Sequence, residues 1–573
     1  MKSMRLLVLY KKTSVYLKEF LYKKKGFYVA VVNFLSKNMA CNKNVRASPY
    51  ALCLLALYLM TVFEISGADV GSWFNHGGNL ANTRARPIGE ALINRYLIQR
   101  MHLRWKFFVG NDITATPAIS NGILYFPAWD GNLYAVSAIT GDLIWKQNLG
   151  NLTGLAPLGT YVNVTVSRST PTIADDLLIV GIYGPAVVVA VNRFTAQLVW
   201  MTRVDPHPLA LITMSGTAYL NGFYVGASSL EELLPPTECC TFRGSIARLD
   251  IRTGAIIWQT FTLLENGGKL GGYSGAAIWG SSPAIDIIRN KLYVGTGNLY
   301  IAPPDVLECQ RRQNNQSRAD QPDQCTSPDA HFDSIMALDL STGDVVWARQ
   351  LGGYDVFYFA CLVPNNPNCP PGPNLDADFG EAPMLLTIYP GGVRRDVVAA
   401  VQKSGFVWVL DRDIGEIVWF NVAGPGGLEG GGVWGAATDG RRIYTNIVNT
   451  NRAPFKLSPS NETTTAGAWT ALDANTGKIL WTTANPSDET CHGPVTLVSD
   501  LLFAGSVAPS GPLYAMDAET GKILWSYNTA ATVYGGVSVS YGCVYLGHGY
   551  SVGLAKFHPT WNRGNYLFAF CIS

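Results

Sequence analysis

Seven copies of one phrase constrain the fold of this chain more than any other feature of its sequence. In each copy a strand-like run enters a short polar turn, usually Thr-Gly, and two or three aliphatic residues then lead to a tryptophan. Asp and Thr side chains bond to local backbone N–H groups, and glycine adopts the positive φ that a hairpin turn needs. The phrases end at Trp145, Trp200, Trp258, Trp347, Trp419, Trp481 and Trp525.

A repeated unit of short strands with a glycine turn is typical of a β-propeller, in which four-stranded blades surround an axis. The two ends of the chain predict an eighth blade. Leu103–Phe107 (LRWKF) is a tryptophan strand without the preceding phrase, and Tyr566–Phe570 (YLFAF) lacks the turn and tryptophan strand that should follow it. Pairing these strands would close the ring and remove two exposed edges. The sequence therefore predicts an all-β, eight-bladed propeller whose last blade joins both termini.

The distribution of charge separates a basic leader from the rest of the chain. Residues 1–46 contain eleven Lys or Arg residues and one acidic residue, Glu19, whereas the whole chain has a formal net charge of only +2. Without residues 1–68, the chain holds 32 basic and 39 acidic residues. A net-negative body argues against nucleic acid as a partner.

The leader has the pattern of a secretory signal peptide. An apolar run over residues 50–63 follows basic residues and precedes the small residues Ser66, Gly67 and Ala68. Cleavage before Asp69 would leave residues 69–573 as a single propeller domain, secreted and without a stable membrane span. The run is short for a span, and an uncleaved signal anchor is the alternative. Met39 is an alternative start of translation.

Secretion predicts disulfides and glycans in the nine cysteines and four sequons of residues 69–573. Cys309 with Cys325, and Cys361 with Cys369, flank short polar insertions and are predicted pairs. The pairing of Cys239, Cys240, Cys491, Cys543 and Cys571 stays open, and the odd count leaves one thiol free. The sequons lie at Asn151, Asn163, Asn315 and Asn461.

The sequence lacks the common motifs of several other enzyme and cofactor classes. No P-loop, HExxH, Gly-x-Ser-x-Gly or Rossmann fingerprint occurs, and no Cys-x-x-Cys-His motif for covalent haem. Any electrons would therefore leave to an external acceptor. The single histidines His331, His492, His548 and His558 lie in predicted loops and are interpreted as solvated or locally bonded.

The repeated phrase resembles the repeat of pyrroloquinoline quinone (PQQ) dehydrogenases over nearly all of residues 69–573. The opening segment WFNHGGNLANTRA (73–85) is similar to the start of those enzymes. The segments SSLEE (228–232), AAIWGSSP (276–283), GTGN (295–298) and AVQKSGF (400–406) resemble the polyvinyl-alcohol-dehydrogenase-like proteins, a secreted branch without a haem domain. The resemblance implies PQQ and calcium at the propeller axis.

The resemblance also implies roles for individual residues. Glu231 and Asn298 match calcium ligands, which would supply hard oxygen donors, although the sequence leaves open whether Glu231 or Glu232 points inward. Trp279 matches the tryptophan that lies against the quinone, and Lys403 matches a basic residue that donates hydrogen bonds to the quinone carbonyls. Further positions that resemble cofactor contacts are Arg168, Thr213, Ser228 and Trp434. Packing or structural hydrogen bonds are the competing interpretation for each of them.

The catalytic base that the resemblance implies has no clear equivalent here. Its place is taken by Tyr358, a poor base at neutral pH with an ordinary pKa of about 10. Asp355 would substitute if the loop shifts, although a turn-stabilising role fits it equally, and Asp376 and Asp378 are remoter candidates. The adjacent cysteines Cys239 and Cys240 are candidates for a vicinal disulfide beside the cofactor.

These observations predict a secreted, PQQ- and calcium-dependent oxidoreductase that oxidises an alcohol, a sugar or a polymer and passes electrons to an external acceptor. The missing base favours an alternative from another class. In that alternative the chain is a catalytically degenerate extracellular propeller that binds a polysaccharide or a protein. A third hypothesis is an assembly scaffold built on the same repeats.

Overall fold

The computed structural model describes residues 71–87, 92–159, 162–235, 237–280, 282–312, 320, 323–363 and 365–572. The predicted leader with its signal peptide, the alternative start at Met39 and the sequon at Asn315 lie outside the described residues.

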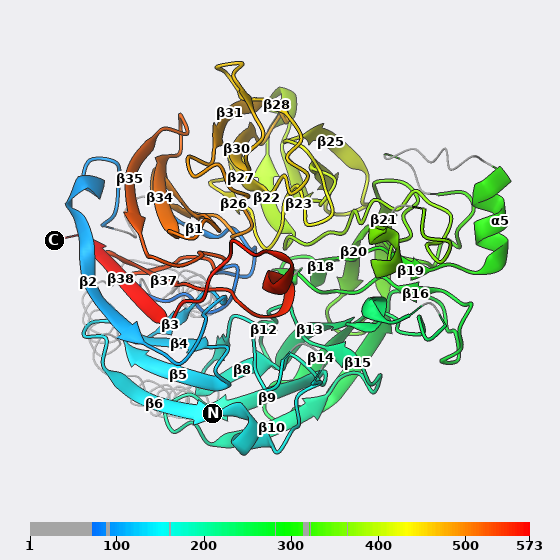
Figure 1. Ribbon diagram of the computed structural model, residues 1–573, viewed down its shortest axis with the longest axis horizontal. Coiled ribbons are helices and arrows are strands. Elements are labelled where there is room, and N and C mark those ends of the chain that lie inside the picture. The colour runs from blue at the N-terminus through cyan, green and yellow to red at the C-terminus, as the bar shows by residue number, and fades with distance from the viewer. Residues whose placement is uncertain are drawn as a thin grey trace, which may run out of the picture. The chain divides into compact units, whose positions relative to one another are not determined.

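Eight sheets, each built on four antiparallel strands, surround one axis (Figure 1). The prediction of an eight-bladed propeller is confirmed. We number the blades in chain order. Blade 1 contains β3 (Ala118–Ser120), β4 (Ile123–Pro127), β5 (Asn132–Ser137) and β6 (Leu143–Asn148); blade 2 contains β7 (Thr172–Ala174), β8 (Leu177–Gly181), β9 (Val187–Asn192) and β10 (Leu198–Arg203); blade 3 contains β12 (Thr217–Tyr219), β13 (Gly222–Ser229), β14 (Ser245–Asp250) and β15 (Ile256–Phe261); blade 4 contains β17 (Ala284–Asp286), β18 (Lys291–Gly295), β20 (Ser334–Asp339) and β21 (Val345–Gln350).

The second half of the ring repeats this arrangement. Blade 5 contains β22 (Met384–Ile388), β23 (Arg395–Val401), β24 (Phe406–Asp411) and β25 (Ile417–Val422); blade 6 contains β26 (Ala437–Thr438), β27 (Arg442–Ile447), β30 (Ala468–Asp473) and β31 (Ile479–Ala484); blade 7 contains β32 (Thr496–Val498), β33 (Leu501–Gly505), β34 (Pro512–Asp517) and β35 (Ile523–Asn528); blade 8 contains β36 (Ser538–Ser540), β37 (Cys543–Gly547), β38 (Tyr566–Ile572) and β2 (Met101–Phe108).

Short elements decorate the loops between these strands. The added strands are β1 (Ala85–Arg86) on β32, β11 (Ala210–Leu211) on β13, and the pairs β16 (Ser274–Gly275) with β19 (Leu299–Ile301) and β28 (Phe455–Lys456) with β29 (Thr463–Thr464). The helical turns are η1 (Ile98–Arg100), α4 (Leu149–Thr153), η2 (Glu231–Leu233), α5 (Pro304–Arg312), η3 (Phe359–Leu362), η4 (Pro390–Gly392) and η5 (Gly553–Phe557).

Strands from the N-terminal and C-terminal parts of the described chain close the ring in blade 8. Strand β2 pairs antiparallel with β38, with Leu103 opposite Phe570 and Phe107 opposite Leu567. Figure 1 shows the blue strand β2 beside the red strand β38. A disulfide between Cys543 and Cys571 ties β37 to β38 within the same blade. The predicted closure by N- and C-terminal strands is confirmed.

The repeated tryptophan joins each blade to the next. Trp419 donates its Nε1–H to the Ala474 carbonyl of the following blade at 2.9 Å, and Trp525 donates to Met101 across the ring closure at 3.2 Å. The glycine of the next phrase packs on the indole, since a Cβ on Gly477 would lie 2.6 Å from Trp419. The same bond is made by Trp105, Trp145, Trp200, Trp258, Trp347 and Trp481. The tryptophan and the glycine of the repeated phrase therefore form the contact between neighbouring blades.

The cysteines form four disulfides in the described part of the chain. The predicted pairs Cys309–Cys325 and Cys361–Cys369 are confirmed. The structure settles the open pairings as Cys239–Cys240 and Cys543–Cys571 and leaves Cys491 as a free, buried thiol.

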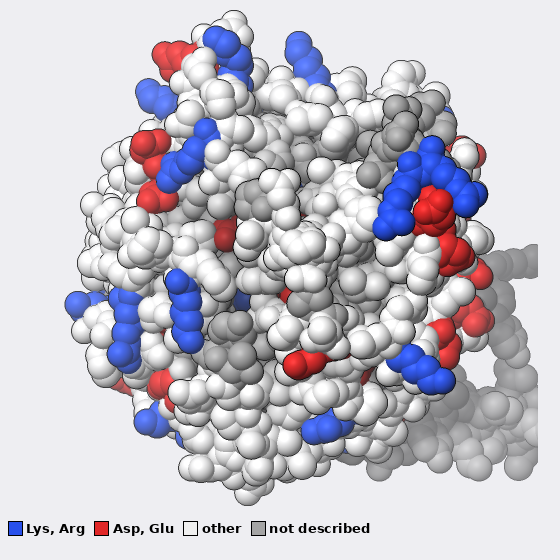
Figure 2. All heavy atoms as spheres, turned by 45° about the vertical axis from the view of Figure 1, so that its right-hand side comes forward, with Lys and Arg blue, Asp and Glu red and all other residues white. Residues whose placement is uncertain are grey.

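The surface of the propeller carries charges of both signs. On the face drawn in Figure 2, basic and acidic side chains of the described residues lie interspersed and are not gathered by sign. Among the described helices, none has the length and apolar character needed to cross a membrane.

Candidate functional site

One face of the ring gathers loop residues from seven blades around a cavity. The first two strands of a blade are antiparallel neighbours, so residues before the first and after the second lie at the same face. Such residues line a cavity of about 410 Å³, within the range typical of small-molecule sites. The segment that holds η5 lies over the centre of the ring in Figure 1 and contributes Gly553, Leu554 and Phe557 to the wall.

Seven of the residues that the sequence predicts to bind the cofactor or the metal line this cavity together. They come from loops and strand ends of blades 2 to 6. The first and last of these residues are 266 positions apart in the chain. They are Arg168, Thr213, Ser228, Trp279, Asn298, Lys403 and Trp434.

An ion-paired lysine forms one part of the cavity wall. Lys403 Nζ lies 2.7 Å from Asp376 Oδ1 and 2.8 Å from Asp378 Oδ2, and all three side chains are nearly buried. Burial opposes the charge of Lys403, but the two carboxylates outweigh it and raise its pKa above the ordinary value. Burial raises the pKa of Asp376 well above its ordinary value, against the opposing effect of Lys403. The wall thus holds a fixed positive charge next to two acidic groups.

Aromatic and cationic groups form the adjoining wall. Trp279 donates its Nε1–H to Asp378 Oδ2 at 2.9 Å, and the ammonium of Lys403 lies 5.0 Å from its ring centroid. Trp434 meets Trp279 edge to face at 5.2 Å, and the Arg168 guanidinium lies 4.2 Å from the Trp434 ring. Indole faces with nearby cations suit a flat, anionic aromatic ligand.

Thr213 has a supporting position in this wall. Its hydroxyl donates to the Trp279 carbonyl at 2.6 Å. The hydrogen bond holds the backbone of Trp279, and the sequence alone offers no sign of it because the two residues are 66 positions apart.

The structure separates the two neighbouring glutamates of η2. Glu232 lines the cavity, and burial raises its pKa to about 7. Glu231 is buried elsewhere, where its carboxylate accepts the backbone N–H groups of Thr241 and Phe242 at 2.7 Å each. His207 Nε2 also lies 3.2 Å from Glu231. The inward carboxylate is therefore that of Glu232, and the predicted metal residue Glu231 does not line the cavity.

Four other predicted residues lie outside the cavity lining. Asp355 is fully buried, and its carboxylate accepts N–H groups of Leu375 and Ala377 at 2.8 and 2.6 Å. Burial raises its pKa to about 6. Tyr358 donates its hydroxyl to the Asn368 carbonyl, which turns it away from the cavity. Cys239 and Cys240 pack within the hydrophobic core of blades 2 to 4.

The oxygen atoms of the cavity are suited to a hard cation. Asn298 donates both Nδ2 hydrogens, to the carbonyls of Leu299 and Phe357, so its Oδ1 is directed away from those partners. Asn298 and Glu232 both line the cavity. An amide oxygen with carboxylates is the donor set that calcium prefers in proteins. The donor chemistry of Asn298 and Glu232 fits calcium.

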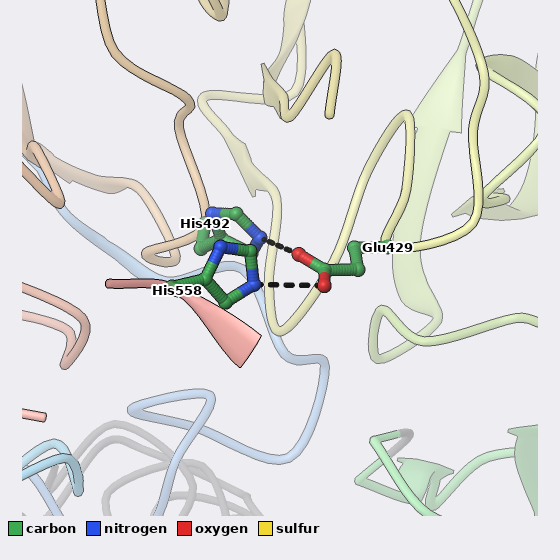
Figure 3. Close-up of side chains that lie close together, drawn as sticks. All are labelled: Glu429, His492 and His558. Carbon is green, nitrogen blue, oxygen red and sulfur yellow. Dashed lines mark hydrogen bonds and ion pairs between the residues drawn. The ribbon is translucent and has the colours of Figure 1, made fainter. Parts of the chain in front are cut away.

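A second cluster at the cavity wall escaped the sequence interpretation. His492 and His558 both bond to Glu429, each through Nε2 at 2.8 Å (Figure 3). The interpretation of these histidines as solvated or locally bonded missed this shared partner, which lies 63 and 129 positions away; His492 is 1% exposed and is bonded locally only through Nδ1, to Thr490. No local motif predicts this contact.

The fold and the site define a class of protein: an eight-bladed propeller whose inter-blade loops enclose an axial ligand cavity, the architecture of quinoproteins. The chain belongs to the PQQ_2 family, described as outer membrane protein assembly factor BamB. The family model matches residues 102–349 and 465–555, more than half of the chain.

Two curated relatives and one solved structure are also similar to this chain. The chain is 28% identical over 435 residues to polyvinylalcohol dehydrogenase of Sphingopyxis sp. (strain 113P3). That alignment covers 71% of this chain and 60% of that protein. It is 27% identical over 526 residues to polyvinylalcohol dehydrogenase of a Pseudomonas species, covering 84% of this chain and 73% of that protein. The quinohemoprotein alcohol dehydrogenase structure from Comamonas testosteroni superposes with a TM-score of 0.68 at 19% identity, covering 89% of this chain and 82% of that one, and shares the fold.

Proposed function

We propose that this protein is a secreted, PQQ- and calcium-dependent dehydrogenase that oxidises an alcohol, a sugar or a polymer and passes the electrons to an external acceptor. The observation that carries the proposal is the convergence of Trp279, Asn298 and Lys403 on one cavity. The likeness to two proteins named polyvinylalcohol dehydrogenase supports an alcohol or polymeric alcohol as the substrate class.

The residues of the cavity divide into holding and charge-stabilising roles. Trp279 provides a flat face for the quinone, and Arg168 and Lys403 offset its negative charge. Glu232 and Asn298 would hold the calcium ion through oxygen atoms. When bound, the quinone would accept two electrons from the alcohol, with calcium polarising it as a Lewis acid.

Asp376 is the best-placed group to take the hydroxyl proton. It lines the cavity, and Lys403 contacts its Oδ1 only, so Oδ2 is left to accept a proton. Asp378 is less suited, because Trp279 Nε1 and Lys403 already contact its Oδ2 and the Asn298 N–H its Oδ1. Asp355, the candidate named from the sequence, is held by two backbone N–H groups outside the cavity lining.

Secretion belongs to the same proposal. Disulfides persist in oxidising compartments, and the described residues contain four of them. The side chains of Asn151, Asn163 and Asn461, three of the four sequons, are exposed and open to glycosylation.

Dye reduction by the quinone-loaded protein tests this function. Purified protein loaded with PQQ and calcium is given primary alcohols, secondary alcohols and polyvinyl alcohol, and reduction of an artificial acceptor is followed. We expect alcohol-dependent turnover that falls roughly 100-fold or more in Asp376→Asn. Asp175→Asn, at an exposed turn of blade 2, serves as the matched control and should keep wild-type turnover. Turnover that is absent with every alcohol, or unchanged in Asp376→Asn, contradicts the proposed chemistry.

The second candidate function is a binding propeller without turnover. It is favoured by Asp355 and Tyr358, which lie away from the cavity although the family resemblance puts the base in their segment. Calorimetric titration of the folded protein with polyvinyl alcohol and with cell-wall polysaccharides distinguishes the two. Binding of a polysaccharide by a chain that takes up no quinone would support this candidate.

A further inference from the structure

Three polar side chains from three different blades meet at one wall of the cavity. Glu429 lies between β25 and β26, His492 between β31 and β32, and His558 between η5 and β38. Their ligand atoms all lie within 4.8 Å of one another. Figure 3 shows the Glu429 carboxylate facing both imidazoles, with one oxygen toward each ring.

The ligating atoms of the two histidines point at the carboxylate of Glu429. Nε2 of His492 lies 2.8 Å from Glu429 Oε2, and Nε2 of His558 lies 2.8 Å from Oε1. The other ring nitrogen of His492, Nδ1, lies 3.1 Å from the Thr490 hydroxyl. A polar partner on the far nitrogen is the arrangement that orients a metal-binding histidine.

Aromatic packing fixes both imidazole rings in these orientations. Trp561 stacks on His558 with centroids 3.8 Å apart and planes 9° apart. The same indole meets His492 edge to face at 4.8 Å, and Tyr534 lies 5.8 Å from His492 on a near-parallel plane. Ligand rings that cannot rotate lose little conformational entropy when an ion binds.

We propose that Glu429, His492 and His558 form a binding site for a divalent transition metal ion of the zinc type. Two imidazole nitrogens and one carboxylate oxygen are a ligand set that zinc accepts at about 2.0–2.2 Å, with a fourth position left for water or a ligand. The two N···O contacts of 2.8 Å are shorter than the separation of ligand atoms around a shared ion, so small side-chain movements would have to part the three groups for zinc to enter. Glu429 and His492 line the cavity, which gives water or a ligand access to the site from the cavity.

This site differs in chemistry from the calcium site proposed around Asn298 and Glu232. Imidazole nitrogen is a poor ligand for calcium and a good one for zinc, so the two ions are expected to sort between the two positions. Binding of zinc would also join loops of blades 6, 7 and 8 at the cavity wall. The proposal is independent of the quinone, since none of the three ligands is assigned to it.

Metal counting on the full-length protein tests the site. Chelator-treated protein, without quinone and with excess calcium, is equilibrated with zinc, passed over gel filtration and assayed for zinc by mass spectrometry. We expect one zinc per wild-type chain. His558→Gln and Glu429→Gln should bind zinc at least 100-fold more weakly than the wild type. His102→Gln, on the exposed side of β2, is the matched control and should retain zinc as the wild type does.

X-ray absorption of the zinc-loaded wild type gives a second readout that needs no variant. We expect scattering from two imidazole rings. A wild-type chain that retains no zinc, equal retention in a folded His558→Gln variant, or a coordination shell of oxygen alone would each overturn the proposal and leave a metal-free Glu–His–His ion-pair cluster.

Discussion

The ammonium nitrogen of Lys403 lies 2.8 Å from Oδ2 of Asp378 in the wall of the axial cavity. The same carboxylate accepts the indole N–H of Trp279 and the backbone N–H of Asn298. One aspartate thus positions the aromatic, cationic and amide groups that the proposed function uses. The cavity is organised by contacts between its own walls before any ligand binds.

Replacing the lysine should affect both the cofactor and the fold. In Lys403→Met the carboxylates of Asp376 and Asp378 lose their counter-charge, and breaking a buried pair costs roughly 3 kcal/mol. We expect quinone affinity to fall at least tenfold and the free energy of unfolding in urea to fall by about that amount. Lys269→Met, an exposed lysine, is the control. Unchanged quinone affinity in folded Lys403→Met would contradict the assigned role.

The two glutamates of η2 should respond differently to the same substitution. Glu232→Gln removes a cavity carboxylate, so calcium-dependent quinone uptake should weaken at least tenfold while stability changes little. Glu231→Gln loses a carboxylate that accepts two backbone N–H groups, so stability should fall by roughly 1–3 kcal/mol. Calcium titration with urea unfolding of both variants separates the effects. The reverse pattern would place the metal ligand at Glu231.

The glycine of the repeated phrase should tolerate no side chain. Gly477 has φ +72° and faces Trp419, whereas Gly440 has φ +80° and open space around it. Gly440→Ala should cost the left-handed strain alone, roughly 1–2 kcal/mol. Gly477→Ala adds a clash with the indole worth roughly another 1–3 kcal/mol. Equal loss of unfolding free energy in the two variants would contradict the inter-blade role of the indole.

A buried glutamate should make stability fall as pH rises. Burial raises the pKa of Glu381 from about 4.5 to about 8, and Thr445 donates to its Oε1 at 2.9 Å. A carboxyl with a raised folded pKa stabilises the fold fully below pH 4.5, and this contribution is lost as pH rises through 8. The shift corresponds to roughly 5 kcal/mol.

Glu381→Gln keeps the oxygen acceptor and cannot ionise. Urea unfolding at pH 5 and pH 8 should therefore show the wild type losing several kcal/mol relative to the variant between the two values. Parallel profiles would contradict the raised pKa, since they require Glu381 to ionise as readily in the folded protein as in the unfolded chain.

Features set by local sequence were predictable, and features set by long-range contacts were not. The Thr-Gly turn and the tryptophan strand are local, so the blades could be counted, and an orphan strand at each end pointed to the closure of β2 on β38. Cys309–Cys325 and Cys361–Cys369 close short loops and could be paired. Cys543 and Cys571 meet only because their strands are neighbours in blade 8.

The direction of side chains in loops was beyond the sequence. Consecutive residues of a helical turn diverge, so nothing local decides between Glu231 and Glu232. The carboxylate of Asp355 is held away from the cavity by the N–H groups of Leu375 and Ala377, some twenty positions away. The Glu429–His492–His558 cluster requires three blades to be in place before it exists.

An equilibrium titration of the quinone into the wild type and Trp279→Phe, with calcium and with a chelator, tests the central claim that the axial cavity is the quinone site. The account predicts calcium-dependent uptake of one quinone per wild-type chain, with affinity at least tenfold weaker in Trp279→Phe because the indole face and its bond to Asp378 are lost. No uptake by folded wild type, or equal affinity in the two proteins, would contradict it.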